Sequence, residues 1–190
     1  MKTELIGEKE LLGKSLKVDE VKYRYEKFDG NMSDPATKII VKRSDAVAAI
    51  VYNTDTKQYI FARQFRAATI GQGSGWLTEA MAGVIDDGET AEKALAREMQ
   101  EELGYTPLKT EKIASFYTAP GYATEQVHLY YVQVNNSSKT SQGGGLAEEN
   151  ENIQSICHTL DEIKALIASG SFNDAKTLIG CEYILRNQKV

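Results

Sequence analysis

The chain has 190 residues, of which 42% are apolar, so it can bury a core as one domain with an appendage or as two small domains. Its net charge of −5 argues against a sequence-independent nucleic-acid binder, which needs a basic surface. The sequence contains neither a secretory leader nor an apolar run of about 18 residues, so we expect a cytoplasmic protein that does not bind membranes.

Residues 1–43 have the pattern of a small sheet. Strands are predicted at the apolar run 11–16, at the alternating segment 21–28, and at 37–43 after a turn rich in Asp, Gly and Pro. Three strands bury too little area to stand alone, so we expect this sheet to pack on the rest of the chain or on a second copy. We therefore predict an N-terminal β-sheet subdomain, with a boundary near Ser44.

The remaining residues, 44–190, alternate between strands and helices. Strands are predicted at 46–52 and 59–65 as an antiparallel pair, and then at 76–82, 113–117 and 126–134. The Asn-, Ser- and Gly-rich stretch 135–145 is typical of a mobile loop, and helices are predicted from about residues 160 and 173. The two cysteines, Cys157 and Cys181, and the two histidines, His128 and His158, have no metal-site spacing and are interpreted as structural, the cysteines as buried.

One stretch, residues 83–105, combines a glycine turn, a helix and several carboxylates. Thr90 is a suitable N-cap, residues 91–103 are good helix formers, and Gly104 stands where a helix stop is expected. Glu98, Glu101 and Glu102 follow at i, i+3 and i+4, so they share one helix face beside an apolar stripe of Leu95, Met99 and Leu103.

Like charges at this spacing destabilise a helix unless a cation offsets them. Hard divalent ions prefer such oxygen ligands, which favours Mg²⁺, with Mn²⁺ as a second possibility. Arg97 can pair with Glu101, four residues away, or reach Glu89 across the turn, and either pairing would orient a ligand. An acidic face that is only solvated is the alternative.

The fixed positions of this stretch resemble the Nudix box, with Tyr105 at a position that is usually aliphatic; the wider resemblance covers roughly residues 15–188. It implies an α/β fold (α+β mixed sheet), an α/β/α sandwich with a small N-terminal antiparallel β-sheet subdomain. It implies that Glu98, Glu101, Glu102 and the Ala82 carbonyl hold the metal. It also implies supporting roles for these box residues: Gly83, Glu89, Arg97 and Gly104.

Further segments resemble the nucleoside-diphosphate-sugar branch of this family, which includes ADP-ribose and GDP-mannose pyrophosphatases. These are Ala119-Pro120-Gly121, which could also be a simple turn, and the run 63–69 with Glu79. The resemblance implies that Arg66 contacts phosphate or the terminal sugar, as suits a planar guanidinium. Arg63 has a weaker claim, and Glu79 joins them as a substrate-binding residue.

The glycine-acidic segment 143–151 resembles the loop that completes the active site in this branch. The resemblance implies that Glu151, or Glu149 in reserve, is the base that deprotonates the attacking water; a solvated run of charges is the alternative. Base recognition in similar proteins uses the N-terminal sheet, often of a partner subunit. Tyr23, Tyr25 and Arg43 are therefore candidates, and a homodimer is expected.

The leading hypothesis is a Mg²⁺-dependent pyrophosphatase that hydrolyses a nucleoside diphosphate sugar to a nucleoside monophosphate and a sugar phosphate. One alternative is a different nucleotide substrate, such as an oxidised nucleoside triphosphate or a dinucleoside polyphosphate. The other is a domain without catalysis that senses a ligand. Such domains often lose box carboxylates, and this chain retains all of them.

Overall fold

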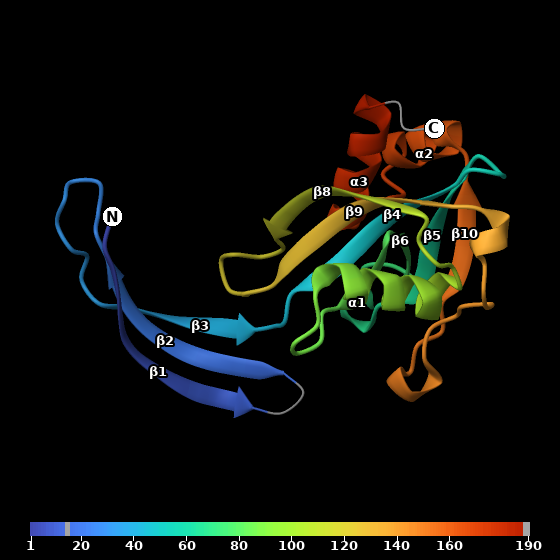
Figure 1. Cartoon of the computed structure of the whole chain (residues 1–190). Coiled ribbons are helices and arrows are strands. Elements are labelled where there is room, and N and C mark those ends of the chain that lie inside the picture. The colour runs from blue at the N-terminus through green and yellow to red at the C-terminus, as the bar shows by residue number, and fades with distance from the viewer. Residues whose placement is uncertain (14–15, 188–190) are drawn as a thin grey trace. The chain divides into compact units, whose positions relative to one another are not determined.

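The computed structural model describes residues 1–13 and 16–187, and the chain divides into two compact units (Figure 1). The first comprises Met1–Asp45 and Tyr117–Gln126, and the second comprises Ala46–Phe116 and Val127–Val190. Within the described residues, no helix is both long and apolar enough to cross a membrane.

The first unit contains an antiparallel three-stranded sheet in the order β1-β2-β3. Its strands are β1 (Thr3–Gly13), β2 (Lys17–Tyr25) and β3 (Ala36–Lys42). The predicted strand at 11–16 overlaps β1 at 11–13, but its bounds are wrong, because β1 begins at Thr3 and ends at Gly13; residues 14 and 15 lie outside the described part. Turn 117–126 adds to this unit through hydrogen bonds of Val41 N to Tyr122 O (2.7 Å) and Thr124 N to Val41 O (3.1 Å).

The second unit is built on a mixed sheet in the order β10-β5-β4-β9-β8, in which β4 and β9 are parallel while β5 is antiparallel to both β10 and β4. The short strands β6 and β7 pair with β5 and β4. The strands are β4 (Ala46–Asn53), β5 (Gln58–Phe65), β6 (Trp76–Glu79), β7 (Met81–Val84), β8 (Lys109–Tyr117), β9 (Gln126–Val134) and β10 (Gln154–His158).

Three helices cover this sheet: α1 (Ala91–Glu98), α2 (Leu160–Ala168) and α3 (Ala175–Arg186). Single turns complete the secondary structure: η1 (Ala67–Thr69), η2 (Met99–Leu103), η3 (Asn136–Ser138) and η4 (Ala147–Glu149). Each of the three helices begins at a side-chain N-cap, namely Thr90, Thr159 and Asp174. These caps satisfy amide groups that a helix start leaves without intrahelical partners.

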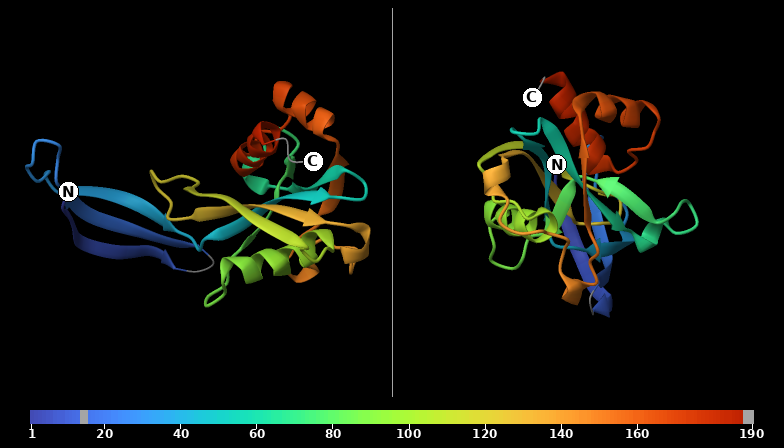
Figure 2. Two further views of the ribbon diagram at one scale, coloured as in Figure 1. Left: turned by 45° about the horizontal axis from the view of Figure 1, so that its top comes forward. Right: turned by 90° about the vertical axis from the view of Figure 1, so that its right-hand side faces the viewer.

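Successive residues of β4 face opposite helical layers. Val47 and Val51 pack in a cluster with Leu95 of α1, whereas Ile50 packs in a second cluster with Ile163 and Ile184 of α2 and α3. All eight residues of β4 are buried, as expected for a strand covered on both faces. The two helical layers are visible in Figures 1 and 2, and the predicted α/β/α sandwich is confirmed.

The two cysteines differ in their environments. Cys181 is buried in the cluster between the sheet and α3, as predicted, but Cys157 is exposed. Cys157 lies on β10, which is an edge strand of the sheet, and composition alone does not reveal which face of an edge strand is covered. The prediction of two buried thiols is therefore wrong for Cys157.

Candidate active site

The site lies where strands β4 and β5 separate. The two strands pair only over Val51–Asn53 and Gln58–Ile60; beyond this, β5 pairs with β6 and β4 pairs with β7. Glu79 therefore stands opposite Ala62 at the end of β6, and Ala82 stands opposite Ala48 on β7. Where β4 and β5 separate, the segment that precedes the box helix, β6 and β7, lies between these two core strands.

The box helix follows the prediction closely and ends in a wider turn. Leu95, Met99 and Leu103 are buried, which confirms the apolar stripe. The α-helical part stops at Glu98, and η2 continues as a π-helical turn to the C-cap Gly104, whose φ is +78°. A left-handed residue at this position is usually glycine, because it has no Cβ to collide with the backbone.

Gly83 leaves room for the carboxylate of Glu98. A Cβ atom added at Gly83 would lie 1.7 Å from Cδ of Glu98 and 2.0 Å from its Oε1. The Glu98 carboxylate thus packs directly on the backbone that follows Ala82, and any side chain at position 83 would displace it. This contact brings Glu98 next to the segment that carries the Ala82 carbonyl.

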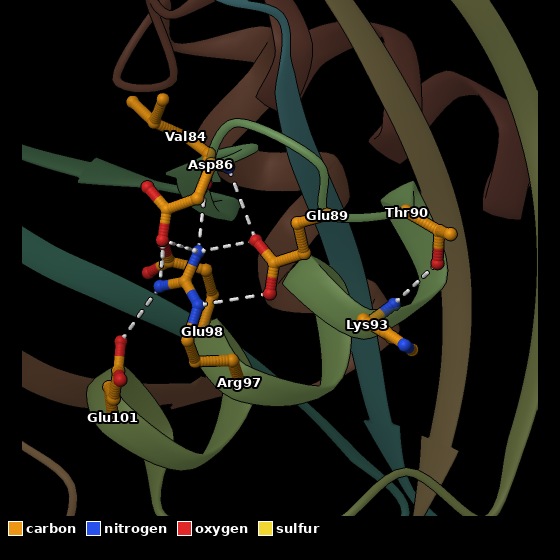
Figure 3. A network of polar contacts seen from close by, with 8 residues as sticks. All are labelled: Val84, Asp86, Glu89, Thr90, Lys93, Arg97, Glu98 and Glu101. Carbon is orange, nitrogen blue, oxygen red and sulfur yellow. Dashed lines mark hydrogen bonds and ion pairs between the residues drawn. The ribbon is translucent and has the colours of Figure 1, made fainter.

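Arg97 holds the acidic residues of the box together (Figure 3). Its guanidinium donates to both oxygens of Glu89 (Nε to Oε1, 3.2 Å; Nη2 to Oε2, 3.0 Å) and to the Val84 carbonyl (2.9 Å). Its Nη1 reaches Oε1 of Glu98 at 2.7 Å and Oε2 of Glu101 at 3.1 Å. Both predicted pairings, with Glu89 and with Glu101, are present together. The bonds to Glu89 and then to Glu98 raise the pKa of Arg97 above its usual value.

Glu102 is the most unusual residue of the site. Only 1% of its surface is exposed, and both carboxylate oxygens are buried without a hydrogen-bond partner among the described residues. Burial, followed by the nearby charges of Glu98 and Glu151, raises the pKa of Glu102 well above its usual value, and Arg66 opposes this shift. A buried carboxylate in this position is costly unless a cation accompanies it.

Glu98 shares this environment. Burial raises the pKa of Glu98 to about 7, although the bond from Arg97 acts in the opposite direction. Desolvation disfavours the charged form of a carboxyl group, and a bound cation would restore it. Two neighbouring carboxyl groups with pKa values raised by burial make this end of the box helix a candidate functional site.

The donor set fits a hard divalent ion. In residues 1–13 and 16–187, no three acidic, imidazole or thiol side chains already converge as a complete metal site. Arg97 accounts for this, because it draws Glu98 and Glu101 toward itself. The orphaned oxygens of Glu102 lie buried close by, and oxygen donors of this type suit Mg²⁺ or Mn²⁺.

A second cluster of charges surrounds Glu79, which is 2% exposed. Its Oε1 accepts a hydrogen bond from Nε of Arg66 at 2.7 Å, and its Oε2 pairs with Nζ of Lys176. Burial works against the charge of Arg66, but the bond to Glu79 raises the pKa of the guanidinium above its usual value. With a bond to each oxygen, Glu79 is suited to orient Arg66.

Lys176 is absent from the sequence-based set of site residues. It lies in the first turn of α3, where it pairs with Glu79 and with Asp174 Oδ1 at 3.1 Å. A cation at a helix N-terminus is unfavourable because it opposes the helix dipole. A lysine in the first turn of the helix predicted from about residue 173 therefore indicated a nearby anionic partner. The ion pair with the buried Glu79 offsets this unfavourable position of Lys176, and the pairing is seen only in the folded structure.

The predicted base loop lies beside Arg66. Arg66, Phe65 and Gln64 line a cavity of about 250 Å³ together with residues 149–152. Glu151 is half-buried and its Oε2 accepts from Leu146 N at 3.1 Å, whereas Glu149 is exposed on η4. The predicted mobile loop 135–145 forms η3 and then a glycine run that hydrogen-bonds to the end of the box helix.

The remaining candidates lie on β5 and in the first unit. Arg63 is exposed on β5, where it pairs with Gln154 of β10 and Thr78 of β6. In the first unit, Arg43 forms an ion pair with Glu125 at 2.8 Å, and Tyr25 stacks on Tyr23 with ring centroids 6.4 Å apart. The turn 119–121 also belongs to the first unit, where it joins β8 to β9.

Comparisons with known proteins agree with this geometry. Residues 42–178 match the model of the NUDIX domain family. The chain is 31% identical over 186 residues to a GDP-mannose pyrophosphatase of Cronobacter sakazakii (strain ATCC BAA-894), covering 97% of this chain and 95% of the relative. It is also 31% identical over 147 residues to a GDP-mannose pyrophosphatase of Escherichia coli (strain K12), covering 76% and 75% of the two chains.

A solved structure shares the fold. The crystal structure of an ADP compounds hydrolase superposes with a TM-score of 0.75 at 17% identity, covering 100% of this chain and 98% of that chain. At this identity the similarity extends to the fold alone.

Proposed function

Because this chain belongs to the NUDIX family and is a Nudix hydrolase, we propose that it cleaves the diphosphate bond of a nucleoside diphosphate sugar, with GDP-mannose as the first substrate to test. The observation that carries the proposal is Glu102. Its buried oxygens lack a partner among the described residues, and Arg66 lies close enough to influence its pKa. A site that combines unsatisfied carboxylates with an oriented guanidinium is suited to a metal-bridged diphosphate.

The box residues would hold the divalent ion. Glu98, Glu101, Glu102 and the Ala82 carbonyl are the proposed donors, and Mg²⁺ is the proposed ion, with Mn²⁺ as a substitute. When bound, such an ion supplies electrophilic activation of the diphosphate and lowers the pKa of water. Arg97, supported by Glu89, would fix the orientation of Glu98 and Glu101, because it touches both carboxylates.

Arg66 would bind the diphosphate, and Glu151 would accept the proton. Nε of Arg66 donates to Glu79 at 2.7 Å, which fixes the guanidinium plane. Its other nitrogens have no hydrogen bond within residues 1–13 and 16–187, so they could bind phosphate oxygens. One oxygen of Glu151 accepts from Leu146 N, which orients the carboxylate for removal of a proton from the attacking water. The products would be a nucleoside monophosphate and a sugar phosphate.

A substrate panel tests this proposal. Purified protein would be assayed for phosphate-containing products from GDP-mannose, ADP-ribose, an oxidised nucleoside triphosphate and a dinucleoside polyphosphate, each with Mg²⁺, with Mn²⁺ and with EDTA. We expect metal-dependent release from a nucleotide sugar, with kcat/KM at least about tenfold above the other classes. Preference for a triphosphate would overturn the substrate class, and release from none would favour a ligand sensor.

Glu151→Gln tests the base. We expect kcat to fall by about 10²- to 10³-fold, with a smaller change in KM, because the amide cannot accept the proton. Glu149→Gln is the matched control, since Glu149 lines the same cavity and lies two residues earlier in the same loop. Loss of activity in the control with a normal Glu151→Gln enzyme would transfer the role to Glu149.

We also propose that the protein is a homodimer formed through the first unit, with Tyr25 and Arg43 as candidate contacts to the nucleoside base. Support comes from β1, where large apolar side chains are exposed: Leu5 62%, Leu11 48% and Leu12 45%. Exposed apolar side chains of this size are suited to burial in an interface between two copies of the chain. A single species with monomer mass by light scattering at micromolar concentration would contradict this proposal.

A further inference from the structure

The segment that carries Glu151 is joined to the box helix along its backbone. Thr140 N donates to Gly104 O at 2.8 Å, Gly144 N donates to Glu102 O at 2.9 Å, and Gly145 N donates to Glu101 O at 3.0 Å. These contacts connect residues 140–145 to the last turn of the box helix, the same turn that bears two of the proposed metal ligands.

The hydrogen bonds meet a need of the helix end. The last carbonyls of any helix have no intrahelical partner and must be satisfied from outside. Here the carbonyls of Glu101 and Glu102 receive the amides of Gly145 and Gly144, while Gly104 N caps the carbonyl of Gln100 at 3.1 Å. The glycine run is therefore part of the C-terminal cap of the box helix, and the position of one fixes the other.

Close approach of the two backbones requires glycine on both sides. A Cβ atom at Gly143 would lie 2.5 Å from the carbonyl oxygen of Glu102, and one at Gly104 would lie 2.2 Å from that of Ser141. Backbone atoms cannot move aside as the end of a long side chain can. Gly104 thus does more than terminate the helix: it also admits the segment that leads to Glu151.

Gly145 has a different neighbour from Gly143. Its added Cβ would lie 2.6 Å from Cβ of Glu151 and 2.7 Å from Oε2 of the same residue. The turn is closed by Glu151 N to Leu146 O at 3.1 Å and by Leu146 N to Glu151 Oε2 at 3.1 Å. The side chain of Glu151 therefore occupies the space that a side chain at position 145 would need.

We propose that Gly145 is a positioning residue for Glu151, and that it forms with Gly143 a glycine clamp that sets this carboxylate relative to Glu98 and Glu102. The inference rests on the proposed function only for the catalytic role of Glu151. The clamp itself is a property of the backbone contacts. It predicts that filling the space at Gly145 moves Glu151 without removing it.

The chain offers a matched pair of variants, Gly145→Ala and Gly144→Ala. Both glycines donate a backbone hydrogen bond to the box helix, and both have positive φ, +81° at Gly145 and +113° at Gly144. Alanine is strained at either position, and more so at Gly144. Only at Gly145 does the new Cβ meet Glu151, because at Gly144 its nearest neighbour is Ile153 O at 3.9 Å.

We expect both variants to have a lower Tm, but only Gly145→Ala to lower kcat, by about tenfold or more with KM changed less than about threefold. The loss should disappear in a Glu151→Gln background. Equal kcat in the two glycine variants, or an undiminished loss in that background, would overturn the proposal. A Glu151→Gln enzyme with normal kcat would instead refute the base assignment in the proposed function.

A second measurement needs neither metal nor turnover. Leu146 N donates to Glu151 Oε2, so displacement of Glu151 should speed amide hydrogen exchange at Leu146 by about tenfold in Gly145→Ala and not in Gly144→Ala. Unchanged exchange at Leu146 in a folded Gly145→Ala protein would count against the clamp. If Gly145→Ala does not fold, Leu146→Pro is the second variant, because it removes the amide that donates to Glu151 Oε2. A normal kcat in Leu146→Pro would overturn the proposal.

Discussion

Strands β1 and β4 represent opposite extremes of one chain. Every residue of β1 is exposed, whereas every residue of β4 is buried between two helical layers. Both strands contain large apolar side chains, but β1 also carries charged residues and β4 carries none, so composition explains part of the difference. The two strands also differ in the elements packed on them: α1 packs on one face of β4, and α2 and α3 pack on the other. Burial of a strand thus depends on the helices that pack on it. The carboxyl groups with pKa values raised by burial, Glu98 and Glu102, lie in the unit built around β4.

This contrast assigns separate tasks to the two units. The sheet of the second unit lends its apolar surroundings to Glu98 and Glu102, whose pKa values rise for that reason. The exposed apolar residues of β1 have the character of a surface that associates. We therefore expect substitutions in the second unit to change chemistry and those on β1 to change assembly.

Glu102→Gln should give the largest effect on chemistry. We expect kcat to fall by about 10²- to 10³-fold with the fold retained, because a proposed carboxylate ligand of the divalent ion is lost. In EDTA at pH 8, the mutant should unfold at the same or a higher temperature than the parent, since a neutral amide costs less free energy to bury. A turnover assay would measure kcat, and scanning calorimetry with and without Mg²⁺ would measure the unfolding temperature. A near-normal kcat at saturating Mg²⁺ would contradict the role of Glu102 as a ligand.

Arg97→Lys should give an intermediate effect on the same unit. Lysine keeps the charge but cannot make the paired contacts to Glu89 together with those to Glu98 and Glu101. We expect the apparent affinity for Mg²⁺ to fall by about 10- to 100-fold, measured by isothermal titration. Arg63→Lys is the control, as Arg63 is exposed on β5. Equal affinities in parent and Arg97→Lys would remove Arg97 from its supporting role.

Leu5→Lys tests the other side of the comparison. We expect the dimer dissociation constant to rise by about tenfold, measured by analytical ultracentrifugation, because an apolar contact would acquire a charge. Glu4→Gln changes the net charge by the same amount at the neighbouring position, and it should have a smaller effect. Loss of Mg²⁺ affinity in Leu5→Lys, with assembly unchanged, would break the division of tasks between the units.

The smallest expected effect is a pH dependence of stability. The pKa of Glu98 in the folded state, about 7, lies above its ordinary value of 4.5, so between these limits the folded protein retains a proton that the unfolded chain has lost. Stability of the metal-free protein should therefore decrease as pH rises through this range and then level off. In EDTA, Tm should fall by about 2 to 8 °C, and by less in Glu98→Gln. Identical slopes would refute the contribution of Glu98.

Local signals in the sequence predicted the box helix well. The N-cap at Thr90, the left-handed Gly104 and the buried stripe of Leu95, Met99 and Leu103 all depend on residues within a few positions of one another. The layered fold was predictable for a similar reason, because strand and helix periodicities alternate along residues 46–186. Here local preference and tertiary structure agree.

The features that the sequence did not predict depend on neighbours distant in the chain. Lys176 enters the site only because α3 packs beside Glu79, and Cys157 is exposed only because β10 is an edge strand. The π-helical turn at 99–103 likewise follows from the segment that docks on its carbonyls. Hydrophobic periodicity contains no information about such partners, which lie 40 or more residues away in several cases.

The parallel pairing of β4 with β9 also constrains the order in which the molecule forms. Ala46 lies beside Val127, so this ladder cannot close until the entire box and β8 have been synthesised. The antiparallel β1–β2 pair, in contrast, joins residues separated by a short connection. Closing a long loop lowers the entropy of the chain before the stabilising contacts between the strands form. We therefore expect the second unit to fold more slowly than the β1–β2 hairpin. On the ribosome, the exposed sheet would be complete before the catalytic unit.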